Sequence, residues 1–115
     1  MSDGREAEIA GWFEARSDRA IETSCARVFL QGETAFKIKR WVEYGFLDYS
    51  TLEKRQWAVA RELDFNRATA PDIYRRTQRL TRASGGGFEL DGPGEVVDAV
   101  LEMRRFNPDA VLSSQ

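Results

Sequence analysis

The sequence predicts an α+β fold, with a five-stranded antiparallel sheet, one main packed helix and a short N-terminal helix. Three observations favour it. A β-hairpin pattern lies in the first half of the chain, a capped amphipathic segment follows it, and β-leaning segments separated by glycine-containing turns fill the second half. One helix on an antiparallel sheet is the simplest architecture for this order. The 115 residues are enough for a single domain, 1–115.

The first expected element is a short amphipathic helix over residues 5–16. Ile9, Trp12 and Phe13 recur at helical spacing, so they should share one side of it. A helix with one apolar side is expected to lie on the sheet. A surface helix that contacts another domain fits the same pattern.

A hairpin is expected next. Residues 20–31 are β-leaning, with the best strand core at 26–30, and Gly32 marks a tight turn before a second strand at 34–42. Side chains alternate across a strand, so the second strand should have two different faces. One face should carry Phe36 and Ile38, and the other Ala35, Lys37, Lys39 and Trp41.

The main helix is expected after a connector at 43–49. Ser50 and Glu53 have the form of a capping box, and the helix should run to about Arg67 before Pro71 interrupts the pattern. Its apolar stripe should be Leu52, Val59 and Leu63, with Ala60 and Trp57 beside it. Four aromatic side chains should pack and anchor the helix to the sheet: Trp41, Tyr44, Phe46 and Tyr49.

The second half of the chain predicts a three-stranded meander. Strands are expected at 72–82, 88–90 and 95–106, separated by glycine-containing turns. Residues 107–115 resemble the start of a further helix.

Composition excludes several kinds of chemistry. The chain contains no histidine, which removes Ser-His-Asp and Cys-His catalysis, and its net charge of −2 requires neither a nucleic acid nor an anionic membrane as partner. The single cysteine, Cys25, cannot form an intramolecular disulfide, and this favours a reducing, cytoplasmic compartment. The arginine cluster at 75–82 is interpreted as a solvated strand face.

Lys37 and Glu62 are the most suggestive pair. Lys37 lies in the middle of a predicted strand, and Glu62 lies in the helix that follows it. Kinases use a strand lysine to bind the ATP phosphates and a helix glutamate to orient that lysine. An ordinary structural ion pair fits the same spacing, and Lys39 shares the face of Lys37 and competes for the role.

Four stretches carry a resemblance to a known family: GFLDYSTLEKR, REL with NR three residues later, APDIY and DGPGEVVDAVLEMRRF. Over about residues 21–110 the chain resembles the N-terminal lobe of aminoglycoside-phosphotransferase-like kinases, of the kind fused to a C-terminal P-loop ATP-binding domain. It implies a protein-kinase-like lobe whose parent reaction transfers a phosphoryl group from ATP to a hydroxyl of a small molecule.

The same resemblance implies a role for individual residues. Lys37 would bind the phosphates, Glu62 would be its partner, Ala35 would contact adenine, and Met103 would end the strand that leads into the hinge. Residues 23–26 would form the loop that covers the phosphates.

The chain also departs from the family pattern. The covering loop has no glycine, which puts a close backbone approach to phosphates in doubt, and Cys25 is expected there as a small buried strand residue. The catalytic aspartate and the metal ligands of such kinases lie in a C-terminal lobe, so the chain is expected to be a lobe truncated after the hinge, without catalytic or metal-binding residues. Magnesium would enter only with the missing lobe.

The expected partners are therefore ATP and the missing lobe or P-loop domain, with self-association through the exposed lobe interface as a further expectation. Two alternatives stay open. The chain could be a non-catalytic nucleotide-binding or protein-interaction module with the same fold, or an unrelated α+β interaction domain in which Lys37 and Glu62 meet by coincidence.

Overall fold

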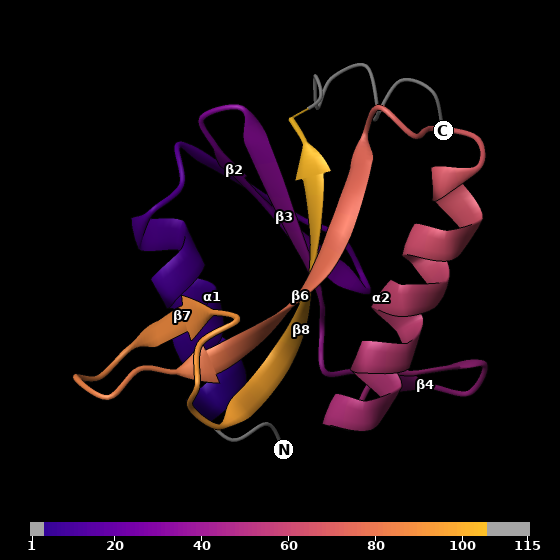
Figure 1. Cartoon of the computed structure of the whole chain (residues 1–115). Helices are drawn as coiled ribbons and strands as arrows, with labels where there is room; N and C mark the ends of the chain where they lie inside the picture. Colours follow the sequence, from indigo (N-terminus) through magenta and orange to yellow (C-terminus); the bar gives the residue numbers. More distant parts are fainter. Residues whose placement is uncertain (1–3, 106–115) are drawn as a thin grey trace.

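A computed structural model describes residues 4–105, and it has the α+β fold that the sequence predicts (Figure 1). A six-stranded sheet has the order β1-β2-β3-β8-β6-β7, and every neighbouring pair is antiparallel. A separate two-stranded hairpin, β4–β5, precedes the second helix. The elements are α1 (Gly4–Ala15), β1 (Arg19–Glu22), β2 (Ala26–Gln31), β3 (Thr34–Lys39), β4 (Glu43–Tyr44), β5 (Leu47–Asp48), α2 (Leu52–Arg67), β6 (Tyr74–Arg82), β7 (Phe88–Leu90) and β8 (Val96–Arg104).

The expectation of five strands in the sheet was wrong, because the first β-leaning segment forms two strands. A turn at 23–25 separates β1 from β2, and Arg19 to Glu22 pair with Leu30 to Arg27. The turn is closed by the Thr23 side chain, whose Oγ1 accepts a hydrogen bond from the Ala26 amide at 3.1 Å. A four-residue strand with a mostly exposed surface has no clear apolar alternation, so the pattern did not separate it from β2.

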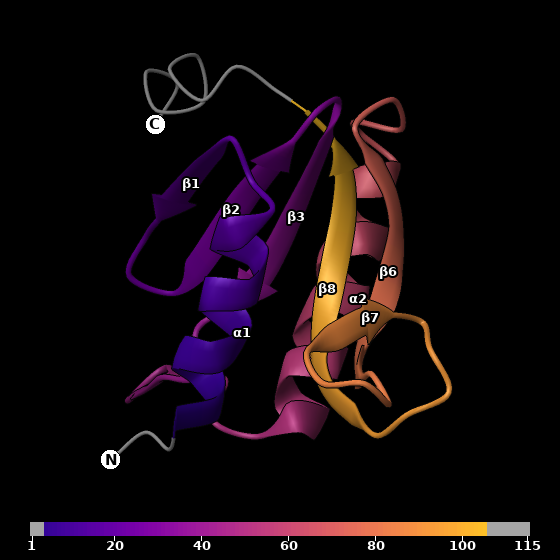
Figure 2. The same ribbon diagram turned by 90° about the vertical axis from the view of Figure 1, so that its left-hand side faces the viewer.

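The two helices cover opposite faces of the sheet (Figure 2). Helix α1 buries Ile9 and Phe13 on the face that also carries Phe29 of β2, and the Phe13 and Phe29 rings stack with centroids 4.9 Å apart. This confirms that α1 is a helix that lies on the sheet. Helix α2 packs Val59 and Leu63 against the other face. The second core comprises Val28, Leu30, Ala35, Val59, Leu63, Ala99, Leu101 and Met103.

Helix α2 begins one residue later than expected. Thr51 is the N-cap, since its side chain accepts the Lys54 amide, whereas Ser50 hydrogen-bonds Asp48 instead. The placement of Trp57 beside the apolar stripe was also wrong, because this residue is 64% exposed. The third buried residue of α2, beside Val59 and Leu63, is Arg55, which is only 3% exposed.

Strand β3 has the two faces that alternation predicts up to Lys39, where it ends. Phe36 and Ile38 lie in the core under α1, and Ala35 lies in the core under α2. Trp41 follows the end of the strand and no longer shares the lysine face: its indole packs beside the α1 core. The strand pairs with β8 only from Thr34 to Lys37.

Strand β8 carries an irregularity that the sequence does not show. Its pairing with β6 slips between Leu80 and Thr81, which face Asp98 and Val96. Val97 and Val100 consequently both belong to the core under α1, although they are three residues apart. The strand runs over Val96–Arg104, shorter than expected, and β6 begins at Tyr74.

The arginines of β6 lie on a neutralised surface, in agreement with the solvated face predicted for them. Arg75 and Arg76 both bond Glu102, and Arg79 and Arg82 contact Asp91 and Glu8. Of the helices in the described range, neither is long and apolar enough to span a membrane. The helix expected over 107–115 lies outside the described residues.

Candidate functional site

Lys37 and Glu62 form the ion pair that the sequence predicts. The Lys37 ammonium donates a hydrogen bond to Glu62 Oε2 at 2.8 Å, which links β3 to α2. Both groups come from regular elements: Lys37 sits in the paired part of β3, opposite Leu101 of β8, and Glu62 faces the sheet from the middle of α2. The pair is therefore held by the sheet and by the packing of α2.

Lys39 joins the same carboxylate through its other oxygen. Its ammonium donates to Glu62 Oε1 at 2.6 Å and lies 5.3 Å from the centre of the Tyr49 ring. The two lysines differ in exposure: the Lys37 side chain is 25% exposed and that of Lys39 only 8%. Lys37 is thus the more exposed of the two lysines.

The two lysines determine the charge state of Glu62. Burial raises the pKa of this carboxyl, but the charge of Lys37 and the hydrogen bonds from both lysines outweigh burial and hold the pKa below its usual value. Glu62 is consequently ionised at neutral pH. Two cations on one anion leave an excess of one positive charge at this place in the fold.

Ala35 and Met103, the residues expected near adenine, are neighbours across β3 and β8. They face each other in the pairing register, two residues from Lys37 and Leu101. Both side chains are buried in the core under α2, with Ala35 fully inaccessible and Met103 3% exposed. The structure therefore brings the two residues together with Lys37 on one face, but it presents neither side chain at the surface.

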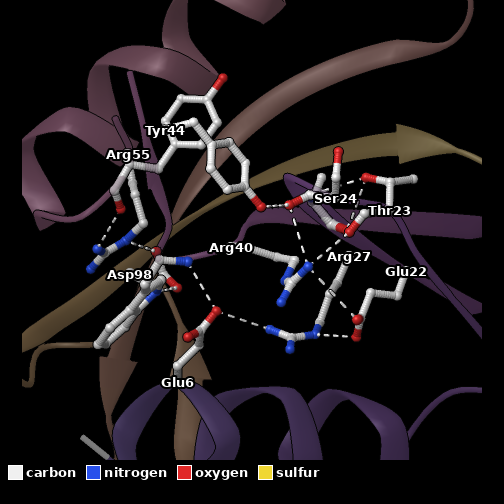
Figure 3. A network of polar contacts seen from close by, with 12 residues as sticks. Glu6, Glu22, Thr23, Ser24, Arg27, Arg40, Tyr44, Arg55 and Asp98 are labelled. Atoms are coloured by element: carbon white, nitrogen blue, oxygen red, sulfur yellow. Dashed lines mark hydrogen bonds and ion pairs between the residues drawn. The ribbon is translucent and has the colours of Figure 1, made fainter. Parts of the chain in front are cut away.

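The turn at 23–25, expected to cover phosphates, is held from outside by two side chains (Figure 3). Arg40 donates to the carbonyl oxygens of Thr23 and Ser24, and the Tyr44 hydroxyl donates to that of Ser24. None of the turn residues has a positive φ. Cys25 is half-buried in this turn and not inside a strand, which corrects the earlier expectation.

A second ion pair, which is fully buried, was missed by sequence reasoning. Arg55 Nε donates to Asp98 Oδ1 at 2.9 Å, and the Trp41 indole donates to Asp98 Oδ2 at 3.1 Å (Figure 3). Asp98 is fully buried, which raises the pKa of its carboxyl against the lowering effect of Arg55 and of hydrogen bonds from Ala99 and Trp41. The signal available in the sequence was Asp98 within a run of apolar residues.

An open groove of about 500 Å³ lies beside the Lys39–Glu62 contact. It runs between the β4–β5 hairpin and α2, and Phe46, Trp57 and Arg61 are among its lining residues. Phe46 is 90% exposed, so the expectation that it packs and anchors α2 was wrong. A larger hollow of about 570 Å³ lies at the start of α2, and Arg55, Thr51 and Trp41 line it, away from Glu62.

Residues 4–105 contain no group of three or more histidine, cysteine, aspartate or glutamate side chains arranged to hold a metal ion. The acidic side chains of the site region are each engaged by cations: Glu62 by two lysines and Asp98 by Arg55. The arrangement around Glu62 is thus suited to binding an anion through Lys37.

Among curated proteins, the chain is similar to uncharacterized proteins of Mycobacterium bovis and Mycobacterium tuberculosis. Each is 36% identical over 93 residues, which cover 81% of this chain but 17% of the relative. The chain therefore spans less than a fifth of the length of the curated relatives it matches. Their names state no activity. No protein-family model matches the chain, and no solved structure matches it.

Proposed function

We propose that the chain is the ATP-binding N-terminal lobe of an aminoglycoside-phosphotransferase-like kinase. The observation that carries this proposal is the 2.8 Å contact between Lys37, on the third strand, and Glu62, on the helix that follows it. Protein kinases require a lysine on the third strand paired with a glutamate on the next helix to bind the ATP phosphates. In this proposal the turn between the first two strands would take the place of the loop that covers the phosphates in such enzymes, although it contains no glycine.

The parent reaction would transfer a phosphoryl group from ATP to a hydroxyl group of a small molecule. In kinases the catalytic aspartate and the magnesium ligands lie beyond the lobe that holds the strand lysine. The chain would therefore contribute the binding of the nucleotide and not the chemistry, and magnesium would be held by groups of the second lobe. The match covers 17% of the length of each curated relative, which fits a lobe of a larger protein.

A thermal-shift titration with Mg-ATP tests the proposal. Saturating ligand should stabilise the wild-type chain by about 2.7 kcal/mol at a hundredfold excess over Kd, and Lys37→Ala should abolish this shift. Lys54→Ala is the matched control, because Lys54 is an exposed lysine on α2 that pairs with Asp48. A wild-type chain that shows no shift, or a Lys37→Ala chain that shifts equally, would count against nucleotide binding by this lobe.

One observation favours a second candidate, a protein-interaction module with the same fold. Phe46, Trp57 and Phe65 are 90%, 64% and 77% exposed, and the last two lie on α2 itself. Aromatic side chains are enriched at protein interfaces relative to the rest of the surface. In the kinase proposal the second lobe would cover this surface. In the alternative, the surface itself would be the functional site, and Mg-ATP would have no effect.

A further inference from the structure

Glu62 contacts two lysines, which is one more cation than a phosphate site requires. A single glutamate is enough to orient a strand lysine, yet Glu62 accepts one hydrogen bond from Lys37 and a second from Lys39. Each lysine takes a different carboxylate oxygen. The question is therefore what the second lysine does.

The two lysines are buried to different depths, and this indicates different roles for them. Lys39 is 8% exposed, and its ammonium lies between Glu62 and the Tyr49 ring. Lys37 is 25% exposed and uses one of the three hydrogens of its ammonium on Glu62. Lys37 is thus the more exposed ammonium and keeps hydrogens for a ligand, whereas Lys39 is the more buried one and lines the groove beside Glu62.

The two lysines also differ in their position along the sheet, and this difference indicates the same division of roles. Lys37 lies opposite Leu101 of β8, two residues from the paired Ala35 and Met103. Lys39 lies beyond the last β3–β8 pair and faces Ala26 of β2. A nucleotide whose base lies toward Met103 would therefore reach Lys37 first.

We propose that Lys39 is a positioning residue: it holds one oxygen of Glu62 so that Glu62 stays in place and Lys37 is free to bind a phosphate. This inference rests on the proposed nucleotide function. It assigns the phosphate contact to Lys37 and a supporting role to Lys39. The sequence pattern did not decide which of the two lysines binds the phosphate.

The charged and titratable groups around Glu62 determine how the site responds to pH. Lys37 and Lys39 face it from β3, Tyr74 faces it from β6, and Tyr49 faces it from the segment before α2. Burial raises the pKa of both tyrosines above the usual value, so they are neutral at pH 7. Ionisation of Glu62 therefore depends on the two lysines, and loss of either one raises its pKa.

The test measures the Mg-ATP dissociation constant from pH 5 to pH 8 for the wild type and for Lys39→Met, Lys39→Gln and Lys39→Arg. We expect both uncharged variants to bind about tenfold more weakly at pH 7, the usual effect of losing one charge-assisted hydrogen bond. Their affinity should also begin to fall at a higher pH than that of the wild type, because Glu62 becomes protonated sooner. Protonation of ATP itself is common to all four chains, so it cancels in the comparison.

Lys39→Arg is the control that separates positioning from packing, because it keeps the charge and should keep the wild-type pH profile. Circular dichroism checks that each variant is folded, and Lys39→Gln serves if Lys39→Met does not fold. A uniform loss of affinity with an unchanged pH profile, or an equal loss in Lys39→Arg, would overturn the positioning role. If both uncharged variants bind Mg-ATP as tightly as the wild type does, the role of Lys39 is overturned and the proposed function is not. If the wild type binds no Mg-ATP, the proposed function and the role of Lys39 are both overturned.

Discussion

Two carboxylates, Glu62 and Asp98, connect α2 to the sheet in different ways. Glu62 reaches from the helix to two lysines of β3 and stays partly accessible. Asp98 reaches from β8 to Arg55 of the helix and is fully buried. A partly exposed pair can exchange partners with a ligand, whereas a fully buried pair is costly to break. The first arrangement suits a binding site, and the second one suits the orientation of α2.

Replacement of Asp98 by asparagine should destabilise the chain by about 3–5 kcal/mol, because Arg55 would remain buried without its counter-charge. Chemical denaturation with urea measures the change. Glu8→Gln is the control: Glu8 pairs with Arg82 at the surface, and its loss should alter stability by no more than about 0.5 kcal/mol. Similar small effects for both variants would mean that the buried pair does not fix α2.

At the scale of the elements, the turns of the second half determine where β8 begins. Gly94 packs against the backbone of β6, and the Arg82 amide donates to the carbonyl of Glu95 at 2.9 Å. A side chain at Gly94 would put its Cβ 2.0 Å from the Arg82 carbonyl oxygen. This close approach precedes the slip in the β6–β8 pairing that places Val97 in the core under α1.

Gly94→Ala should therefore destabilise the chain by about 1–3 kcal/mol, since the backbone of β6 cannot move aside as a flexible side chain would. Thermal denaturation followed by circular dichroism measures the loss. Gly85→Ala is the matched control, because a Cβ at Gly85 meets no atom within 4 Å. If the two variants are equally stable, the close approach at Gly94 has no energetic importance.

At the scale of the whole molecule, two separate cores lie on the two faces of one sheet, under α1 and α2. Three large aromatic residues remain exposed: Phe46, between β4 and β5, and Trp57 and Phe65 on α2. The last two belong to the same helix as Glu62. A second lobe or a partner that docks there would therefore also fix the helix that carries the site.

The isolated chain should self-associate through these exposed aromatic side chains at high concentration, because apolar groups are removed from water when they meet. Sedimentation velocity over a range of concentrations detects the association. The double variant Trp57→Ser, Phe65→Ser should stay monomeric, while Gln56→Ser, an exposed change on another side of α2, should behave as the wild type. A wild type that is monomeric at every concentration would contradict the prediction.

Local patterns in the sequence determined most of the elements and one part of the site. Helical spacing placed α1 on the sheet, glycine marked the hairpin turn, and alternation put Lys37 and Lys39 on the face that meets Glu62. These features follow from periodicities of two and 3.6 residues, which are properties of a segment by itself.

Only the tertiary structure decided the rest, since it depends on segments that are distant in the chain. The separate strand β1 is defined by its pairing with β2, and the burial of Arg55 is made possible by Asp98, 43 residues away. The same holds for the shared carboxylate: Lys39 and Glu62 are separated by 23 residues, and only the packing of α2 on β3 brings both lysines to one acid. Such contacts leave no periodic signal in the sequence, because each is made by a single residue meeting another across the fold.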